Sequence, residues 1–211
     1  MPAGLFITFE GLDGCGKTTQ IRLLAQALRD RGRAVVETAE PGGTDIGRQI
    51  RRILLDPANK AIHSRTELLL YFGSRAQNVE EVIRPTLSRG QDVICDRFTD
   101  STLVYQGCGR GLDTQMILDL DRIACNGLVP DLTLLIDIDL DTSLQRARRR
   151  NERCDAAESR IDEESFAFHD RVRRGYLGLA EQHPGRFRLI DGRASVEEVA
   201  DSIWKAVAPH V

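Results

Sequence analysis

Short runs of apolar and β-branched residues alternate with longer segments in which apolar residues recur every three or four positions. The first pattern is typical of buried strands, and the second of helices that pack one face against a sheet. The predicted strands cover residues 5–10, 34–38, 92–96, 131–139 and 187–191. The predicted helices cover residues 17–32, 45–56, 65–88, 141–150 and 163–182, and others begin near Asp100, Asp113 and Ser195. Such alternation predicts a three-layer α/β domain, a parallel five-stranded sheet with helices on both faces.

Length and composition limit the number of domains and the classes of partner that we expect. The 211 residues suffice for one domain with a substantial core, and we expect a single domain over residues 1–211. A formal net charge of -3 gives no reason to expect nucleic acid as a partner. No apolar run reaches the roughly 20 residues of a membrane span, and no signal peptide is visible. Five scattered cysteines without a CxxC pair indicate free thiols in a reducing compartment, so we expect a cytoplasmic protein that binds no membrane.

A phosphate-binding loop follows the first predicted strand. Residues 11–18 of the segment FEGLDGCGKTTQ fit the pattern G-x-x-x-x-G-K-[ST] and lie between a strand and a helix. Backbone N–H groups of such a loop bind phosphate oxygens, the lysine reaches the β- and γ-phosphates, and the threonine binds Mg²⁺. The predicted ATP-binding residues are Gly11, Asp13, Gly14, Cys15, Gly16, Lys17, Thr18 and Thr19. The motif predicts a P-loop NTPase fold and ATP binding, but it does not identify the acceptor of the phosphoryl group.

Three further segments indicate where an acceptor binds. EPGGTDIG, residues 40–47, ends the second predicted strand, where ligands of open α/β sheets collect. In YFGSR, Tyr71 and Arg75 share a helix face, and an aromatic ring beside a guanidinium suits a planar base. In DRFTDSTLVYQG, Asp96 is placed to support Mg²⁺ and Arg97 to hold a phosphate. Taken singly, each segment also has a structural explanation: a turn, a core ring beside a surface charge, or helix capping.

In combination, the segments resemble the thymidylate kinase family, which phosphorylates dTMP with ATP. The similarity runs in order along nearly the whole chain and continues through RTELLLYFGSRAQ, GRG, NGLVPDLTLLIDID and RIDEESFAFHDRVRRGY. These later segments are specific to the family, whereas many enzymes share the phosphate loop. The resemblance implies an ATP-dependent nucleoside monophosphate kinase of dTTP synthesis, Mg²⁺ as cofactor and a homodimer.

The resemblance also implies which residues bind dTMP. The family usually has phenylalanine at the position of Tyr71, where the ring stacks on thymine, so the neighbouring Phe72 is a second candidate. Asp13 corresponds to an acidic residue that bonds the 3′-hydroxyl of the sugar; alternatively, it bonds backbone N–H groups of its own loop. The other implied contacts are to the base edge, the 2′ side of the sugar and the monophosphate. The full predicted set is Asp13, Glu40, Arg51, Tyr71, Phe72, Arg75, Arg97, Ser101, Thr102, Tyr105 and Gln106.

Phosphoryl transfer needs positioning and charge stabilisation rather than a general base, because an acceptor phosphate oxygen is already nucleophilic. Family members carry a catalytic arginine either in the phosphate loop or in a lid, here about residues 146–160. Positions 12–15 hold no arginine, so the resemblance implies the bacterial type, with the arginine in the lid. The predicted catalytic residues are Lys17, Arg97, Arg150 and Arg153, with Arg146 as a further lid candidate, and Thr18 and Asp96 are the predicted metal site.

Two alternative functions stay open at this point. One is a P-loop kinase for another deoxynucleotide or for a nucleoside. The other is a non-catalytic ATP switch, which would need neither a monophosphate pocket nor a lid.

Overall fold

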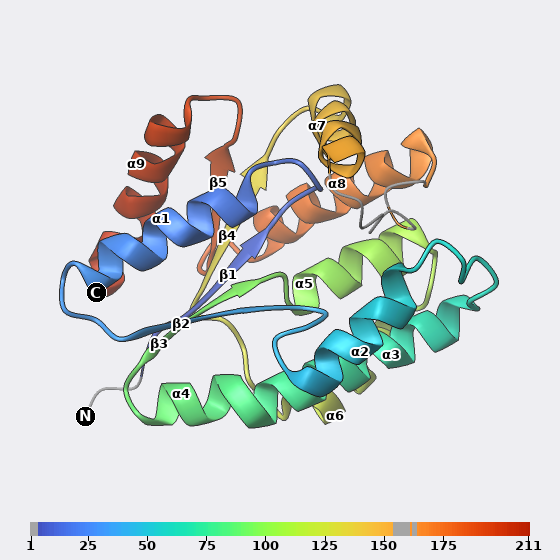
Figure 1. The fold of residues 1–211 in the computed structure, drawn as a ribbon, viewed down its shortest axis with the longest axis horizontal. Coiled ribbons are helices and arrows are strands. Elements are labelled where there is room, and N and C mark those ends of the chain that lie inside the picture. Colours follow the sequence, from blue (N-terminus) through green and yellow to red (C-terminus); the bar gives the residue numbers. More distant parts are fainter. Residues whose placement is uncertain (1–3, 154–160, 162–163) are drawn as a thin grey trace.

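The structure, a computed structural model, describes residues 4–153, 161 and 164–211, except for the side chains of residues 148 and 150–153. One sheet of parallel strands forms the middle layer, with the order β2-β3-β1-β4-β5 (Figure 1). The strands are β1 (Phe6–Glu10), β2 (Val35–Ala39), β3 (Asp92–Asp96), β4 (Leu132–Asp137) and β5 (Phe187–Asp191). The prediction of a five-stranded parallel sheet is therefore confirmed.

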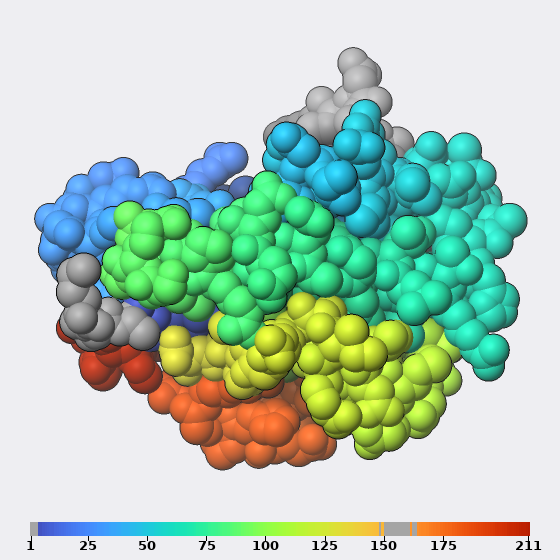
Figure 2. Space-filling view, turned by 90° about the horizontal axis from the view of Figure 1, so that it is seen from below, coloured from blue at the N-terminus to red at the C-terminus, as the bar shows by residue number. Residues whose placement is uncertain are grey.

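Helices cover both faces of this sheet, as predicted. The helices are α1 (Lys17–Arg29), α2 (Asp45–Leu55), α3 (Ser64–Asn78), α4 (Arg84–Ser88), α5 (Thr99–Thr102), α6 (Thr114–Cys125), α7 (Leu140–Arg153), α8 (Phe166–Gln182) and α9 (Val196–Val207). α1 and α9 pack on one face through a single apolar cluster with β1, β4 and β5. α3, α6 and α8 cover the other face. Seen from below, α3, α4 and α6 close that side of the molecule (Figure 2).

The long helix predicted for residues 65–88 is not one regular α-helix. A π-helical segment, η1 (Val79–Ile83), separates α3 from α4, and Pro85 lies in the first turn of α4. Proline has no N–H, and its ring clashes with the carbonyl four residues earlier, so the chain widens before it. A second π-helical segment, η2 (Leu103–Gly109), extends α5. The remaining helices begin and end within a few residues of their predicted limits.

The alternation of side chains along β1 decides what meets at the sheet's carboxyl edge. Ile7 and Phe9 point into the cluster under α1 and α9, whereas Phe6 points into the cluster under α3 and α6. Because successive side chains of a strand face opposite sides, Glu10 falls on the same side as Phe6, toward α5 and α8. A carboxylate is thereby buried at the end of the central strand.

Within the described part of the chain, we find no helix that combines the length and the apolarity needed to cross a membrane.

Candidate active site

The phosphate loop connects β1 to α1 and is held against α7. Gly14 has φ 77°, and a Cβ there would lie 2.7 Å from the Ser143 carbonyl oxygen and 2.9 Å from Cβ of Arg146. Only glycine therefore fits at this contact, for both its backbone angle and its size. Ser143 Oγ donates a hydrogen bond of 2.6 Å to the carbonyl of Asp13. The first turns of α7 are thus fixed directly on the loop.

Most of the predicted ATP-binding residues line a polar cavity above this loop: Asp13, Gly14, Gly16, Lys17, Thr18 and Thr19. Lys17 Nζ donates to the carbonyls of Gly11 and Leu12 at 3.0 and 2.9 Å. The side chain of Cys15 lies in the core under α1, so this residue can offer only its backbone to a phosphate. Arg48 and Arg146 complete a strongly cationic lining, and Arg146 is the one predicted lid arginine whose side chain is described. The side chains of Arg150 and Arg153 lie outside the described residues.

A second cavity adjoins the first and shares its wall. The residues that line both are Asp13, Glu40, Pro41, Arg51 and Arg97, so two ligands in them would meet at these side chains. Of the eleven residues predicted for dTMP, ten line the second cavity; its other lining residues are Pro41, Leu55 and Ile161. Phe72 is the exception, because it packs in the core cluster under α3 and α6 while Tyr71 faces the cavity.

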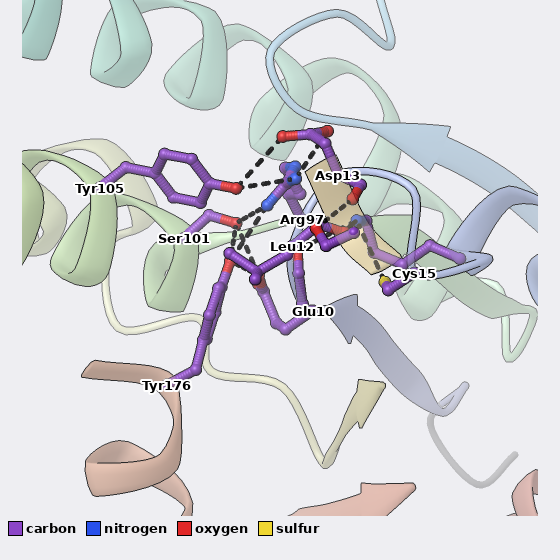
Figure 3. A network of polar contacts seen from close by, with 11 residues as sticks. Glu10, Leu12, Asp13, Cys15, Arg97, Ser101, Tyr105 and Tyr176 are labelled. Carbon is purple, nitrogen blue, oxygen red and sulfur yellow. Dashed lines mark hydrogen bonds and ion pairs between the residues drawn. The ribbon is translucent and has the colours of Figure 1, made fainter. Parts of the chain in front are cut away.

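Arg97 is the centre of the shared wall. Its φ of 69° lies in the left-handed region, an unfavourable conformation for a residue with a side chain, and its N–H donates to the Phe9 carbonyl at 2.9 Å. The guanidinium donates to Asp13 Oδ1 and to the hydroxyls of Ser101, Tyr105 and Tyr176 at 3.1–3.2 Å (Figure 3). The acidic and phenolic partners outweigh the effect of burial and raise the pKa of Arg97, so its charge is permanent.

Asp13 completes this group from the loop side. Its Oδ1 pairs with Arg97 at 3.1 Å and its Oδ2 accepts from the Tyr105 hydroxyl at 3.2 Å. A carboxylate in an anion-binding loop is therefore turned toward the second cavity, where its charge is balanced by Arg97.

Glu10 holds two of the hydroxyl groups that contact Arg97, although no local sequence pattern marks it as a site residue. Its Oε2 accepts from Ser101 Oγ at 2.6 Å and from the Tyr176 hydroxyl at 2.9 Å, and its Oε1 accepts from the Phe98 N–H at 2.8 Å. Since the hydroxyls of Ser101 and Tyr176 both donate to Glu10, their oxygens are oriented to accept from Arg97. Complete burial, together with the charge of Asp100, raises the pKa of Glu10 to about 7.

A buried ion pair lies in the wall of the second cavity, and its carboxylate, Glu40, also lines the first. Arg75 Nε donates to Glu40 Oε2 at 2.5 Å, and its second terminal nitrogen donates to Thr102 Oγ1 at 2.9 Å. Asn78 Nδ2 donates to the other oxygen of Glu40 at 3.1 Å. Arg75 NH1 is buried and has no hydrogen-bond partner among the described residues. Arg75, which lines the second cavity, therefore keeps one fixed guanidinium nitrogen without a partner in the described chain.

The predicted metal residues fit a magnesium nucleotide. Asp96 Oδ1 is buried and has no hydrogen-bond partner in the described part of the chain, and Asp96 lines the phosphate cavity together with Thr18. The described residues include no group of three or more His, Cys, Asp or Glu side chains able to hold a metal ion alone. An ion here would therefore depend on the phosphates of a nucleotide for its other ligands.

A P-loop facing a separate cavity for a second ligand, with cationic side chains between them, defines a P-loop nucleoside monophosphate kinase. The family model described as thymidylate kinase matches residues 9–203. The chain belongs to the thymidylate kinase family.

Individual relatives agree with this assignment over nearly their whole length. The chain is 50% identical to the thymidylate kinase of Trichlorobacter lovleyi over 204 residues, which cover 96% of both chains. It is 53% identical to that of Geobacter sulfurreducens, with 95% of this chain and 94% of the relative covered. The crystal structure of thymidylate kinase from Ehrlichia chaffeensis superimposes with a TM-score of 0.79 at 33% identity and covers 98% of this chain and all of its own.

Proposed function

We propose that the protein transfers the γ-phosphoryl group of ATP to the phosphate of dTMP, giving dTDP and ADP. The observation that carries the proposal is the pair of adjoining cavities with Asp13, Arg51 and Arg97 in their common wall. An oxygen of the acceptor phosphate forms a bond to the γ-phosphorus while the bond to the β-phosphate oxygen breaks. Since this oxygen is already an anion, the protein's task is to hold both phosphates in line and to balance their charge.

Each wall of the site contributes one part of this task. Arg51 and Arg97 hold the acceptor phosphate at the junction. Lys17 exchanges the carbonyls of Gly11 and Leu12 for the β- and γ-phosphates of ATP. Bound Mg²⁺ would neutralise charge on those phosphates, and Thr18 and Asp96 are the residues that would hold it.

At the nucleoside end, the side chains in the second cavity match a deoxyribose and a planar base. We propose that the Tyr71 ring stacks on thymine and that Arg75 donates to it, with Thr102 and Gln106 beside the base. Ser101 belongs to the phosphate end, because its hydroxyl accepts from Arg97. The Asp13 carboxylate accepts a hydrogen bond from the 3′-hydroxyl of the sugar. Tyr105 fills the 2′ side of the sugar and so favours deoxyribose by exclusion.

The lid supplies the remaining positive charge, because the phosphate loop has no arginine at positions 12–15. Arg146, Arg150 and Arg153 are the candidates. Replacing the one that reaches the transferred phosphoryl group with alanine should lower kcat on the order of 10³-fold, while the other two replacements should not. Equal, small effects at all three positions would argue against a catalytic arginine in the lid.

The function is tested by measuring ADP formation with ATP and, separately, dTMP, dUMP, dCMP and thymidine. The proposal expects the highest kcat/KM with dTMP. Preference for thymidine, with dTMP inert, would identify a nucleoside kinase instead. Slow ATP hydrolysis at a rate that does not change when any of the acceptors is added would support an ATP switch.

We also propose a homodimer. Five large apolar side chains on α2, α3 and α6 are exposed: Ile46, Ile53, Leu69, Leu118 and Ile123. A second copy covering such residues would remove apolar surface from water. Sedimentation equilibrium should give twice the monomer mass, and a monomer at micromolar concentration would contradict the proposal.

We propose that the protein is located in the cytoplasm. This proposal is supported by free thiols at Cys15, Cys95, Cys108 and Cys125, which suit a reducing compartment.

A further inference from the structure

Glu67 is a buried carboxylate that no step of phosphoryl transfer uses. It lies on α3, and only 1% of its side chain is exposed. Its Oε1 accepts from Gln106 Nε2 at 3.0 Å and from Arg110 Nε at 3.2 Å. Burying a carboxylate is costly unless it is paired, so its place beside a residue of the base pocket calls for a reason.

The contact with Glu67 fixes the direction of the Gln106 amide. An amide can present either its NH₂ or its carbonyl to a neighbour, but a carboxylate can only accept hydrogen bonds. The NH₂ group of Gln106 therefore faces Glu67. Gln106 lines the acceptor cavity, and its amide oxygen has no hydrogen-bond partner among the residues that the structure describes. The carbonyl is thus the end of the amide left for a ligand.

Arg110 forms an ion pair with Glu67. It pairs with Glu67 on one side and with Glu164 Oε1 at 2.5 Å on the other, and its guanidinium lies 5.0 Å from the centre of the Phe168 ring. Burial alone would lower the pKa of Arg110, but the two carboxylates have the larger effect, and the pKa is raised. Glu67 therefore receives hydrogen bonds from two fixed donors, Gln106 and Arg110.

Among the groups that line the cavity, one acceptor and one donor have no partner in the described chain and are left for a base. The acceptor is the Gln106 carbonyl, and the donor is Arg75 NH1, which is buried and without a partner in the described chain. An N–H beside a carbonyl, as in the imide edge of thymine or uracil, satisfies both groups. Cytosine carries an amino group and a ring nitrogen without hydrogen at those places, so it would oppose donor to donor and acceptor to acceptor.

We propose that Glu67, backed by Arg110, is a specificity-determining residue that selects imide-bearing pyrimidines over cytosine by orienting the Gln106 amide. This inference rests on the proposed function and names the residue that sets its base selectivity. Glu67 is a positioning residue, because it acts on the substrate only through Gln106.

The test compares kcat/KM for dTMP, dUMP and dCMP at saturating ATP in the wild type and in Glu67→Gln. Glutamine at position 67 can donate or accept, so the Gln106 amide becomes free to turn. We expect the ratio of dTMP to dCMP to fall on the order of ten- to a hundred-fold, because Arg75 still opposes cytosine. The ratio of dTMP to dUMP should stay unchanged, since both bases present the same edge.

Two further variants separate orientation from general damage. Glu164→Gln removes the other carboxylate of Arg110 without touching Gln106 and should leave the dTMP to dCMP ratio as in the wild type. In a Gln106→Leu background, Glu67→Gln should produce no further change in the ratio. If Glu67→Gln does not fold, Glu67→Gln combined with Arg110→Gln replaces the ion pair by two amides and should show the same loss of selectivity.

A folded Glu67 variant that keeps the wild-type ratio, or that loses activity equally with all three nucleotides, would overturn the inference. Failure of the wild type to phosphorylate any of the three would instead contradict the proposed function.

Discussion

Glu10→Gln should change how the stability of the protein depends on pH. The pKa of Glu10 rises from 4.5 to about 7 in the folded protein, chiefly because burial disfavours the charged form. Between these values, the folded carboxyl keeps its proton while the unfolded one has lost it. The stabilising contribution of the protonated carboxyl is therefore complete below pH 4.5 and disappears as the pH rises through 7.

The size of the effect follows from the same two values. A rise in pKa from 4.5 to about 7 corresponds to about 3 kcal/mol, at ~1.36 kcal/mol per pH unit. Glutamine has a similar shape and does not titrate. The free energy of unfolding of the wild type, relative to Glu10→Gln, should thus fall by about 3 kcal/mol between pH 4.5 and pH 8.

Urea unfolding at a series of pH values, without nucleotides, measures this difference. The single tryptophan, Trp204, packs against the core under α1 and α9 and reports unfolding by fluorescence. Taking the difference between the two proteins removes the titration of all other groups. Glu37→Gln, at an exposed carboxylate, is the control and should follow the wild type. Parallel stability curves for the wild type and Glu10→Gln would refute the reasoning.

Three other substitutions test the role of burial and the predicted metal site. Asp100→Asn breaks a buried, bidentate pair with Arg186 and should lower the free energy of unfolding by about 3–5 kcal/mol in urea titrations. Arg193→Ala breaks an exposed pair of similar geometry with Asp191 and should leave the urea midpoint almost unchanged; equal shifts would contradict the role of burial. Asp96→Asn should raise the Mg²⁺ concentration for half-maximal activity about tenfold or more without changing the KM for dTMP, and an unchanged Mg²⁺ dependence would remove Asp96 from the metal site.

Local patterns in the sequence were enough to predict the sheet and the phosphate loop. The apolar strands and the glycines of the loop have short-range signatures, because a strand needs its own β-branched run and the loop needs its own glycines. The positions of Arg75, Arg97 and Gln106 in their segments, together with the family resemblance, predicted that the three side chains line one pocket. The structure places these side chains in one cavity.

What the sequence did not indicate depends on contacts between distant segments. Tyr176 reaches Glu10 across 166 positions, and no local pattern marks that pair. Glu10 itself looks like the polar end of a strand until the strand's alternation is combined with the position of α8. Phe72 and Tyr71 are adjacent aromatic residues on one helix, and only the packing of α3 on the sheet decides which one faces the cavity.

The acceptor site is held ready at a cost to the stability of the fold. Arg97 keeps an unfavourable backbone angle, and Glu10, Glu40 and Glu67 are buried carboxylates that water would otherwise solvate. The carboxylates share one arrangement, in which each fixes a group of the acceptor site: Glu40 fixes Arg75, Glu67 fixes the Gln106 amide, and Glu10 fixes the hydroxyls that accept from Arg97. Groups fixed before the ligand arrives need not be ordered during binding, and they keep their direction as charge moves between two phosphates. Substitutions such as Glu10→Gln should therefore make stability depend less on pH between pH 4.5 and pH 8 while weakening the protein's hold on the acceptor phosphate, as expected where function depends on buried charge.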